Sequence, residues 1–222
     1  MRSDEKKLYG NDRFLWSQEV IANYADSLHY GPGLDCIEQL CSKLGRRISL
    51  LDAGAASGAF HAILNNRKIA HDYTACDINR ILLAKGKEHF SLSSAIQCDI
   101  AALPFKADSF DAVVCYGTIF NIEKWEKALA ELLRVSISLT VVNFLAPPLG
   151  SNSLRPRGVL PGQYIWMLNM EEFRSCLERY KLPRPDMLLS WQVPLNRKTA
   201  YPTFRGLDYR LEFTGIWFGN QP

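Results

Sequence analysis

A run of small residues follows an apolar stretch in SLLDAGAASGAF, where one acid and two glycines are spaced as Asp52, Gly54 and Gly58. Small side chains weaken both strands and helices, so their use indicates that the backbone must stay bare. A strand that leads through a glycine-rich turn into a helix is how α/β proteins hold nucleotides. The stretch predicts such a turn, with Ala55 and Ala56 also at the ligand. The alternative is that small residues only pack the helix closely on the sheet.

Two further acids end the next two expected strands, Asp77 in ACDIN and Asp99 in QCDIAALPF. A carboxylate after the second strand can accept hydrogen bonds from both ribose hydroxyls, and one after the third can accept from an adenine amine. The apolar residues that follow, Ile78 and Ile100, are expected to cover the two faces of the purine. A single acid after a strand usually caps a turn or a helix, but two acids behind a glycine-rich turn favour nucleotide binding.

A nicotinamide-dependent oxidoreductase is the first alternative. The fingerprint GxGxxG, laid from Gly54, has Ala56 where a glycine is required. A nicotinamide dinucleotide uses the first acid but has no standard use for Asp99. The chain also lacks a catalytic Tyr-x-x-x-Lys motif. These features disfavour hydride transfer.

The pattern acid-x-G-x-x-x-G resembles motif I of the class I S-adenosylmethionine-dependent methyltransferases, usually D-x-G-x-G-x-G, with Ala56 at the middle glycine. The stretch DSFDAVVCYGTIFNI resembles their motif IV region, which would place Tyr116 and Gly117 beside the methionine part of the cofactor. The resemblance covers residues 50–122. It implies S-adenosyl-L-methionine as cofactor, methyl transfer, and a Rossmann-like α/β fold: a seven-stranded, mostly parallel sheet with helices on both faces and an antiparallel last strand.

The C-terminal part carries a second, narrower resemblance. The segments YIWMLNMEEF, LLSWQVP and GIWFG look like the last third of a group of bacterial methyltransferases that often belong to surface-polysaccharide or secondary-metabolite pathways. This resemblance implies a small-molecule or sugar-like acceptor. A module that has the methyltransferase fold but has lost catalysis is a second alternative, which Ala56 and the lack of an evident general base leave open.

Strands alternate with helices along the chain, which predicts a parallel sheet covered on both faces. We expect one domain over 1–222, made of a helical N-terminal cap or lid (1–46), a cofactor-binding core (47–145) and an acceptor side (146–222). The expected helices are 12–28, 34–44, 57–65, 80–90, 123–134 and 169–180, and the expected strands are 48–51, 73–76, 95–98, 110–115, 138–145, 186–193 and 209–218.

Composition limits the function classes. The 222 residues are 47% hydrophobic and carry a net charge of +3, with no basic cluster, so we expect no nucleic-acid partner. The polar N-terminus and the lack of a long apolar stretch predict neither a signal peptide nor a membrane span. The six cysteines show no C-x-x-C pair. We therefore expect a cytoplasmic protein without a metal site.

Histidine is the usual general base near neutral pH, should an oxygen nucleophile need one. His29 lies next to Tyr30 in the HYGPG break, where an N-terminal lid would cross the site. His61 follows the glycine-rich turn and either lies near the cofactor or faces solvent. His29 and His61 are the candidate catalytic residues.

The acceptor is expected to enter over the same sheet edge, beneath the long loop 146–168. Arg155 and Arg157 could hold a carboxylate or phosphate, and Tyr164 offers a flat face for a ring. With Tyr30 they form the predicted acceptor pocket. The alternative is a solvated loop whose arginines only keep it soluble.

Overall fold

The computed structural model describes residues 30–146, 166–192 and 211–219. Helices and strands alternate through this part of the chain as the sequence predicts. The elements are α3 (Gly31–Leu44), β1 (Ile48–Ala53), α4 (Ala59–Asn66), β2 (His71–Asp77), α5 (Arg80–Phe90), β3 (Ser94–Gln97), β4 (Phe110–Cys115), the 3-10 turn η2 (Ile119–Asn121), α6 (Trp125–Val135), β5 (Ser136–Ala146), α7 (Met170–Arg179), β6 (Met187–Gln192) and β7 (Leu211–Phe218).

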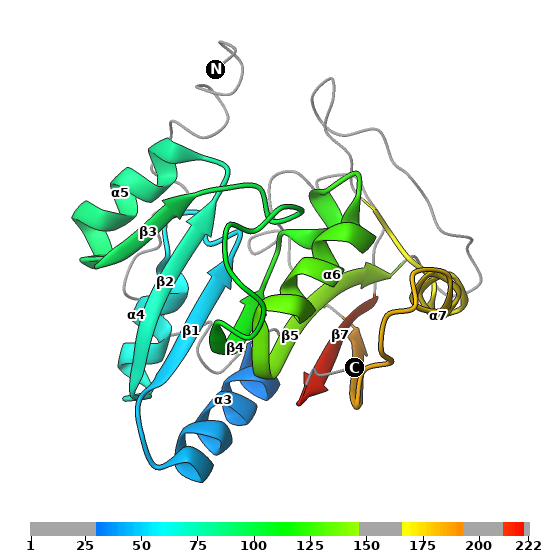
Figure 1. Ribbon diagram of the computed structural model, residues 1–222, viewed down its shortest axis with the longest axis horizontal. Coiled ribbons are helices and arrows are strands. Elements are labelled where there is room, and N and C mark those ends of the chain that lie inside the picture. Colours follow the sequence, from blue (N-terminus) through cyan, green and yellow to red (C-terminus); the bar gives the residue numbers. More distant parts are fainter. Residues whose placement is uncertain (1–29, 147–165, 193–210, 220–222) are drawn as a thin grey trace.

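The strands form one seven-stranded sheet in the order β3-β2-β1-β4-β5-β7-β6. Strands β1 to β5 pair in parallel, and β7 pairs antiparallel with both β5 and β6 (Figure 1). The order reverses between β1 and β4, which is the point where open α/β sheets bind ligands beyond the carboxyl ends of their strands. The predicted fold class, with its antiparallel last strand, is confirmed.

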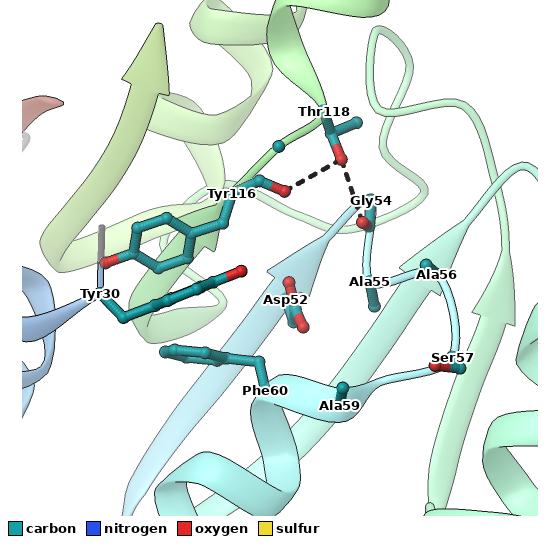
Figure 2. A pocket seen from close by; sticks show the side chains of 11 residues that line it. Tyr30, Asp52, Gly54, Ala55, Ala56, Ser57, Ala59, Phe60, Tyr116 and Thr118 are labelled. Carbon is teal, nitrogen blue, oxygen red and sulfur yellow. Dashed lines mark hydrogen bonds between the residues drawn. The ribbon is translucent and has the colours of Figure 1, made fainter. Parts of the chain in front are cut away.

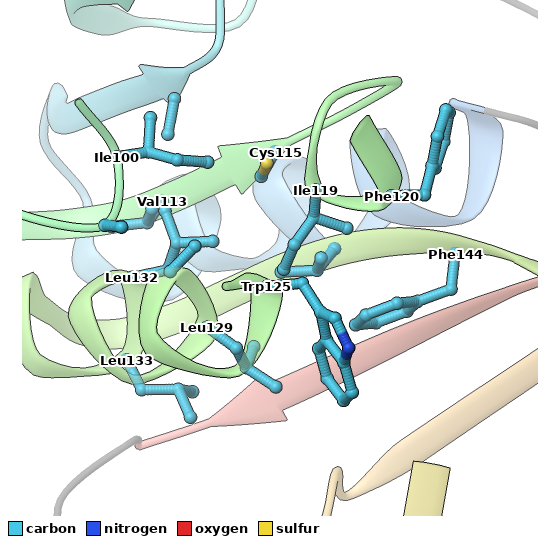
Figure 3. Packing of buried hydrophobic residues seen from close by; sticks show 14 of the residues in the cluster. Ile100, Val113, Cys115, Ile119, Phe120, Trp125, Leu129, Leu132, Leu133 and Phe144 are labelled. Carbon is cyan, nitrogen blue, oxygen red and sulfur yellow. The ribbon is translucent and has the colours of Figure 1, made fainter. Parts of the chain in front are cut away.

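Apolar strands and amphipathic helices build two core layers, one on each face of the sheet. All six residues of β4 are buried, as expected for a strand that helices cover on both sides. One layer lies under α6 and α7, where the ring of Trp125 meets Phe144 edge-on at 5.8 Å between ring centroids (Figure 3). The other lies under α3, α4 and α5. These layers fix the strand ends from which the site is built.

Helix α3 begins at Gly31, three residues earlier than the predicted start at 34. The break HYGPG was expected to be irregular, but proline is well tolerated in the first turn of a helix, where its missing N–H has no partner to lose. Gly33 then lies against the sheet: a Cβ on it would stand 1.9 Å from the hydroxyl oxygen of Tyr116. The predicted helix 12–28 lies outside the described residues.

Candidate functional site

A cleft opens at the carboxyl ends of β1 and β4, where the order of the sheet reverses (Figure 2). Its empty space, which includes open solvent, is about 620 Å³. The lining residues come from the N-terminus of α3, the end of β1, the loop that follows it, the start of α4 and the turn after β4. They are Tyr30, Asp52, Gly54, Ala55, Ala56, Ser57, Ala59, Phe60, Tyr116, Gly117 and Thr118.

The loop 54–58 needs small residues because its backbone is left-handed at three positions. Gly54, Ala56 and Gly58 have φ angles of +79°, +51° and +75°. Ala56 is thus an L-residue in a conformation that favours glycine. The N–H groups of Gly54 and Ala55 both donate to the carbonyl oxygen of Cys76, at 2.8 and 2.9 Å, which ties the loop to the end of β2.

Close neighbours give a second reason for bare backbone. A Cβ on Gly54 would stand 2.3 Å from the Thr118 side chain. A Cβ on Gly86, in α5, would stand 2.2 Å from the carbonyl oxygen of Ser57. Tight packing therefore contributes to this loop, as the alternative interpretation held, but the same loop also lines the cleft.

Asp77 holds the loop through its carboxylate. Its Oδ2 accepts a hydrogen bond from Ala56 N and its Oδ1 accepts one from Asn79 N, each at 2.8 Å. Burial raises the pKa of Asp77, and these backbone donors counter part of the rise. Each carboxylate oxygen has a second lone pair, so both retain the capacity to accept from a diol. The predicted ribose contact stays a prediction.

The residues expected around the purine are placed unequally. Asp99 is exposed, and its Oδ1 accepts from Ala101 N at 2.9 Å, which closes a turn. Ile78 is 71% exposed and is available to a ring. Ile100, by contrast, is 4% exposed and packs in the core layer under α6, which argues against the predicted purine contact. The chain turns at Asp99, and this turn carries the next side chain into the core.

Asp52 is buried at the floor of the cleft (Figure 2). The hydroxyl of Tyr73, on β2, donates a hydrogen bond to its Oδ2. Burial raises the pKa of Asp52 to about 7, the Tyr73 hydroxyl lowers it in part, and the nearby Asp77 raises it. A cation bound in the cleft would stabilise the charged carboxylate.

Three aromatic rings form one wall of the cleft. Tyr30 lies 5.7 Å from Phe60 and 4.6 Å from Tyr116, and Phe60 lies 5.4 Å from Tyr116, measured between ring centroids. The hydroxyl end of Tyr30 points toward Asp52 (Figure 2). Tyr30 was predicted at the acceptor and Tyr116 at the cofactor, so the structure brings the two expected groups together in one wall.

The turn after β4 is fixed by polar contacts. Gly117, with a φ angle of +70°, donates its N–H to Oδ1 of Asn143 at 2.8 Å. Its carbonyl oxygen accepts from Asn121 Nδ2 at 3.0 Å. The Thr118 hydroxyl donates to the carbonyl oxygen of Gly54 at 3.0 Å, which joins this turn to the loop after β1 (Figure 2).

His61 does not line the cleft, which argues against its predicted role as a catalytic residue. Its ring packs on Tyr73, and its Nδ1 lies 2.9 Å from Nε2 of His71. Because His71 Nδ1 faces the carbonyl oxygen of Ile69 at 2.7 Å, His71 must donate there and accept from His61. Burial lowers the pKa of His61 to about 4, with help from His71. Sequence periodicity could not show that this side of α4 faces β2.

Several predicted site residues lie outside the described residues. They are His29 at the N-terminal side and Arg155, Arg157 and Tyr164 in the long loop. Their roles stay predictions. Gly58 lies in the loop itself but does not line the cleft, and neither do Asp77, Ile78, Asp99 and Ile100.

Four lining residues were missed by the sequence reasoning: Ser57, Ala59, Phe60 and Thr118. Phe60 closes the glycine-rich stretch, and its aromatic character was a signal that a helix start would carry a ring into the cleft. Thr118 directly follows Tyr116 and Gly117, so an extension of that motif by one residue would have found it. The partnership of Asp52 with Tyr73 has no sequence signal, because it depends on strand register.

Residues 51–138 match a family model described as a methyltransferase domain. A demethylmenaquinone methyltransferase from Renibacterium salmoninarum is 38% identical over 82 residues, which are 36% of this chain and 35% of that protein. A ubiquinone/menaquinone biosynthesis C-methyltransferase from Allorhizobium ampelinum is 33% identical over 94 residues, 39% of this chain and 36% of that protein. The chain thus spans about a third of the length of the curated relatives that it matches.

Solved structures resemble the whole fold. The 1,6-didemethyltoxoflavin-N1-methyltransferase of Burkholderia thailandensis, with bound 1,6-didemethyltoxoflavin and S-adenosylhomocysteine, has a TM-score of 0.57 at 17% identity and covers 98% of this chain and 91% of that one. An S-adenosylmethionine-dependent methyltransferase from Mesorhizobium loti has a TM-score of 0.58 at 13% identity, over 86% of this chain and 99% of that one. These likenesses concern the fold.

Within residues 30–146, 166–192 and 211–219, no helix is long and apolar enough to span a membrane.

Three observations indicate the same kind of domain. They are the order of the strands, the glycine-rich loop at the switch point of the sheet and the match to the family model. Residues 51–138 thus resemble a methyltransferase domain, and the fold is that of solved S-adenosylmethionine-dependent methyltransferases.

Proposed function

We propose that this protein is an enzyme that transfers the methyl group of S-adenosylmethionine to a small-molecule acceptor by in-line displacement. One observation carries the proposal: bare backbone from Gly54 to Gly58 meets two acids, the buried Asp52 and the half-buried Asp77, at the switch point of the sheet. A matched methyltransferase domain over the same residues supports it.

The residues present fit the cofactor. Asp52 is a buried acid whose Oδ1 has no hydrogen-bond partner among the described residues, so it suits the cationic methionine end. Asp77 retains acceptor capacity for the ribose, and the exposed Asp99 and Ile78 lie further along the same edge for the adenine. When bound, S-adenosylmethionine would supply an electrophilic methyl group on a sulfonium.

The chain's own contribution is to hold the acceptor in line with that methyl group. Displacement of a good leaving group needs alignment more than it needs acid–base help. Two turns that are bonded to each other, through Thr118 and Gly54, fix the walls between which the acceptor must lie. The wall of Tyr30, Phe60 and Tyr116 offers aromatic surface to an acceptor in the cleft.

Among the described residues that line the cleft, none is a histidine, lysine or arginine. This favours an acceptor whose attacking atom already carries a reactive lone pair or an easily lost proton. Phenol-like and quinol-like oxygens and activated ring carbons are of that kind, and the curated relatives named for quinone methylation act on such rings. A sugar hydroxyl, the other acceptor class predicted, would need a base from elsewhere.

The test uses the full chain. Calorimetry with S-adenosylhomocysteine and with NAD measures cofactor choice, and incubation with methyl-labelled S-adenosylmethionine and small-molecule extracts measures transfer. Micromolar binding of S-adenosylhomocysteine without NAD binding, together with label in a small molecule, is expected. Binding without any transfer would favour the non-catalytic module, and preferential NAD binding would favour the oxidoreductase.

A further inference from the structure

Tyr30 brings a hydroxyl group to the cleft from a part of the chain that the family match does not include. It is the N-cap residue of α3, whereas the matched residues begin at 51. Its ring lines the cleft, and its hydroxyl end points toward Asp52 at the floor (Figure 2). The phenol oxygen of Tyr30 and the carboxyl oxygens of Asp52 are therefore presented to a ligand in the same part of the cleft.

The ring of Tyr30 is held firmly in place. It is 7% exposed and lies between two other rings, stacked on Phe60 at an interplanar angle of 30° and tilted by 56° against Tyr116 (Figure 2). The carbonyl oxygen of Tyr30 accepts from Leu34 N at 2.9 Å, which joins this residue to the first turn of α3. Because the ring is already fixed, its hydroxyl does not have to be ordered when a ligand binds.

The charges around these oxygens decide which ligand group fits. Asp52 Oδ2 accepts from the hydroxyl of Tyr73, and Asp52 Oδ1 has no hydrogen-bond partner among the described residues. Of the described residues that line the cleft, none carries a positive side chain, so the ligand must supply the cation that pairs with Asp52. A carboxylate or phosphate at this place would be repelled by the ionised acid.

A primary ammonium group meets these conditions. Its N–H groups can donate to Asp52 Oδ1 and to the phenol oxygen of Tyr30 at the same time, since a phenol oxygen accepts as well as donates. Hydrogen bonds from a charged donor are the strong ones, and a cation is also favoured beside aromatic rings. An ammonium group is what distinguishes the methionine end of S-adenosylmethionine from a plain nucleoside.

We propose that Tyr30 is a specificity residue for the cofactor: its hydroxyl, together with Oδ1 of Asp52, accepts from the ammonium group at the methionine end of S-adenosylmethionine. This inference rests on the proposed function. It assigns the hydroxyl of Tyr30 to the cofactor, while the ring of Tyr30 stays part of the wall beside the acceptor. The first turn of α3 thereby becomes part of the cofactor-binding unit, although it lies outside residues 51–138.

The experiment uses calorimetry on the full chain at pH 7.5 with S-adenosylhomocysteine and with its desamino analogue, which keeps the carboxylate and lacks the amino group. The wild type should prefer S-adenosylhomocysteine by at least about tenfold. Tyr30→Phe keeps the ring and should weaken S-adenosylhomocysteine about tenfold, as for a hydrogen bond to a charged group, but change the desamino analogue less than about twofold. Tyr180→Phe, at an exposed tyrosine after α7, is the control and should change neither affinity.

A double variant tests whether the two oxygens bind the same group. In an Asp52→Asn background, the effect of Tyr30→Phe on S-adenosylhomocysteine should shrink, because residues that share one ligand atom do not contribute independently. Additive effects would mean that the two oxygens bind separate groups, and would overturn their joint role.

The other results also decide the matter. If Tyr30→Phe weakens both ligands equally, the hydroxyl supports the cleft rather than the ammonium group, and if it weakens neither, the contact does not exist; both results overturn the inference. Equal binding of the two ligands by the wild type, a comparison that needs no substitution, would overturn the ammonium site and leave the proposed function standing. If neither ligand binds, the proposed function fails and the inference fails with it.

Discussion

The hydroxyl of Tyr73 donates a hydrogen bond to the buried carboxyl of Asp52, and so a phenol on β2 stabilises an acid that ends β1 at the floor of the cleft. Even with this donor, burial holds the pKa of Asp52 at about 7, against an ordinary value of 3.8. The protein therefore keeps an acid in a site where its charge is costly, which is typical of a functional group.

Asp52→Asn should stabilise the protein at high pH and weaken cofactor binding. The native carboxyl keeps its proton up to a pH of about 7, whereas the unfolded one loses it near 3.8. Its contribution to stability is complete below 3.8 and is lost as the pH rises through 7. The variant should gain free energy of unfolding at pH 8, on the order of a few kcal/mol at most, and little at pH 4.

Urea denaturation at pH 4, 6 and 8 measures this difference, and calorimetry measures the affinity for S-adenosylhomocysteine. The affinity at pH 8 should fall at least about tenfold, since a charged acceptor is lost. Asp72→Asn, an exposed acid on the same strand as Tyr73, is the control and should change neither quantity strongly. A variant that is less stable than the wild type at pH 8 would contradict the assigned burial cost.

Asp77→Asn should weaken the binding of S-adenosylhomocysteine by about one to two decades. The amide keeps one oxygen, but its NH₂ group must then face the N–H of either Ala56 or Asn79, both of which now donate to the carboxylate. The variant thus loses a charged acceptor and disturbs the glycine-rich loop. Calorimetry at pH 7.5 provides the affinity.

The control for Asp77 is Glu88→Gln, an exposed acid on α5. Asp99→Asn is expected to have a smaller effect, because Asp99 is exposed and its side chain makes one local contact. Affinity retained in Asp77→Asn would remove the ribose role, and the loop contact to Ala56 would then be the whole function of this acid.

Ala56→Gly should leave cofactor affinity equal or slightly better and raise stability. Ala56 has a φ angle of +51°, which costs an L-residue roughly 1–2 kcal/mol. Glycine removes that strain but adds conformational entropy to the unfolded chain, worth about 0.5–1 kcal/mol. The net gain in the free energy of unfolding should therefore be about 0–1.5 kcal/mol, measured by urea denaturation.

Ala55→Gly is the matched control, since Ala55 is not among the residues with positive φ. There the same exchange should destabilise the protein by about 0.5–1 kcal/mol. If Ala56→Gly is the more damaging of the two, the methyl group of Ala56 makes a contact that outweighs its backbone strain.

Some elements were predictable because local rules decide them. The bounds of α5 and β4 agree with the predicted 80–90 and 110–115, since a side-chain cap from Asn79 begins the helix and an unbroken apolar run forms the strand. The predicted start of α3 was wrong because Pro32 was taken to end a helix, although proline is suited to the first turn of a helix. The acids at strand ends were found for a similar reason: their position follows from strand boundaries alone.

The rest of the site depends on contacts between segments that are distant in the sequence. Ile100 follows Asp99 as Ile78 follows Asp77, yet Ile100 is buried and Ile78 is exposed. The core layer under α6 includes Ile100 but not Ile78. Residue spacing gives the phase of a side chain along its own element. It does not tell which neighbour will cover that side chain.

His61→Gln should leave cofactor affinity and methyl transfer unchanged within about threefold, because His61 packs on Tyr73 and His71 rather than in the cleft. The effect of this substitution on the free energy of unfolding should appear at acidic pH. The pKa of native His61 is lowered to about 4, against an ordinary value of 6.5, so the unfolded chain binds more protons between these values. Stability is therefore present above pH 6.5 and is lost as the pH falls toward 4.

In His61→Gln that acid-dependent loss should shrink, because glutamine has no proton to gain and can still donate to Nε2 of His71. Urea denaturation at pH 7.5, 6 and 5 measures the slope, with His89→Gln, an exposed histidine at the end of α5, as the control that keeps the wild-type slope. Arg47 and Asp72 lie near His71, and they counter each other's effect on its pKa, so His61 should dominate the difference. A loss of methyl transfer of a hundredfold or more, with cofactor affinity and fold intact, would restore His61 as a catalytic residue, and the hydrogen bond to His71 would then have to break during turnover.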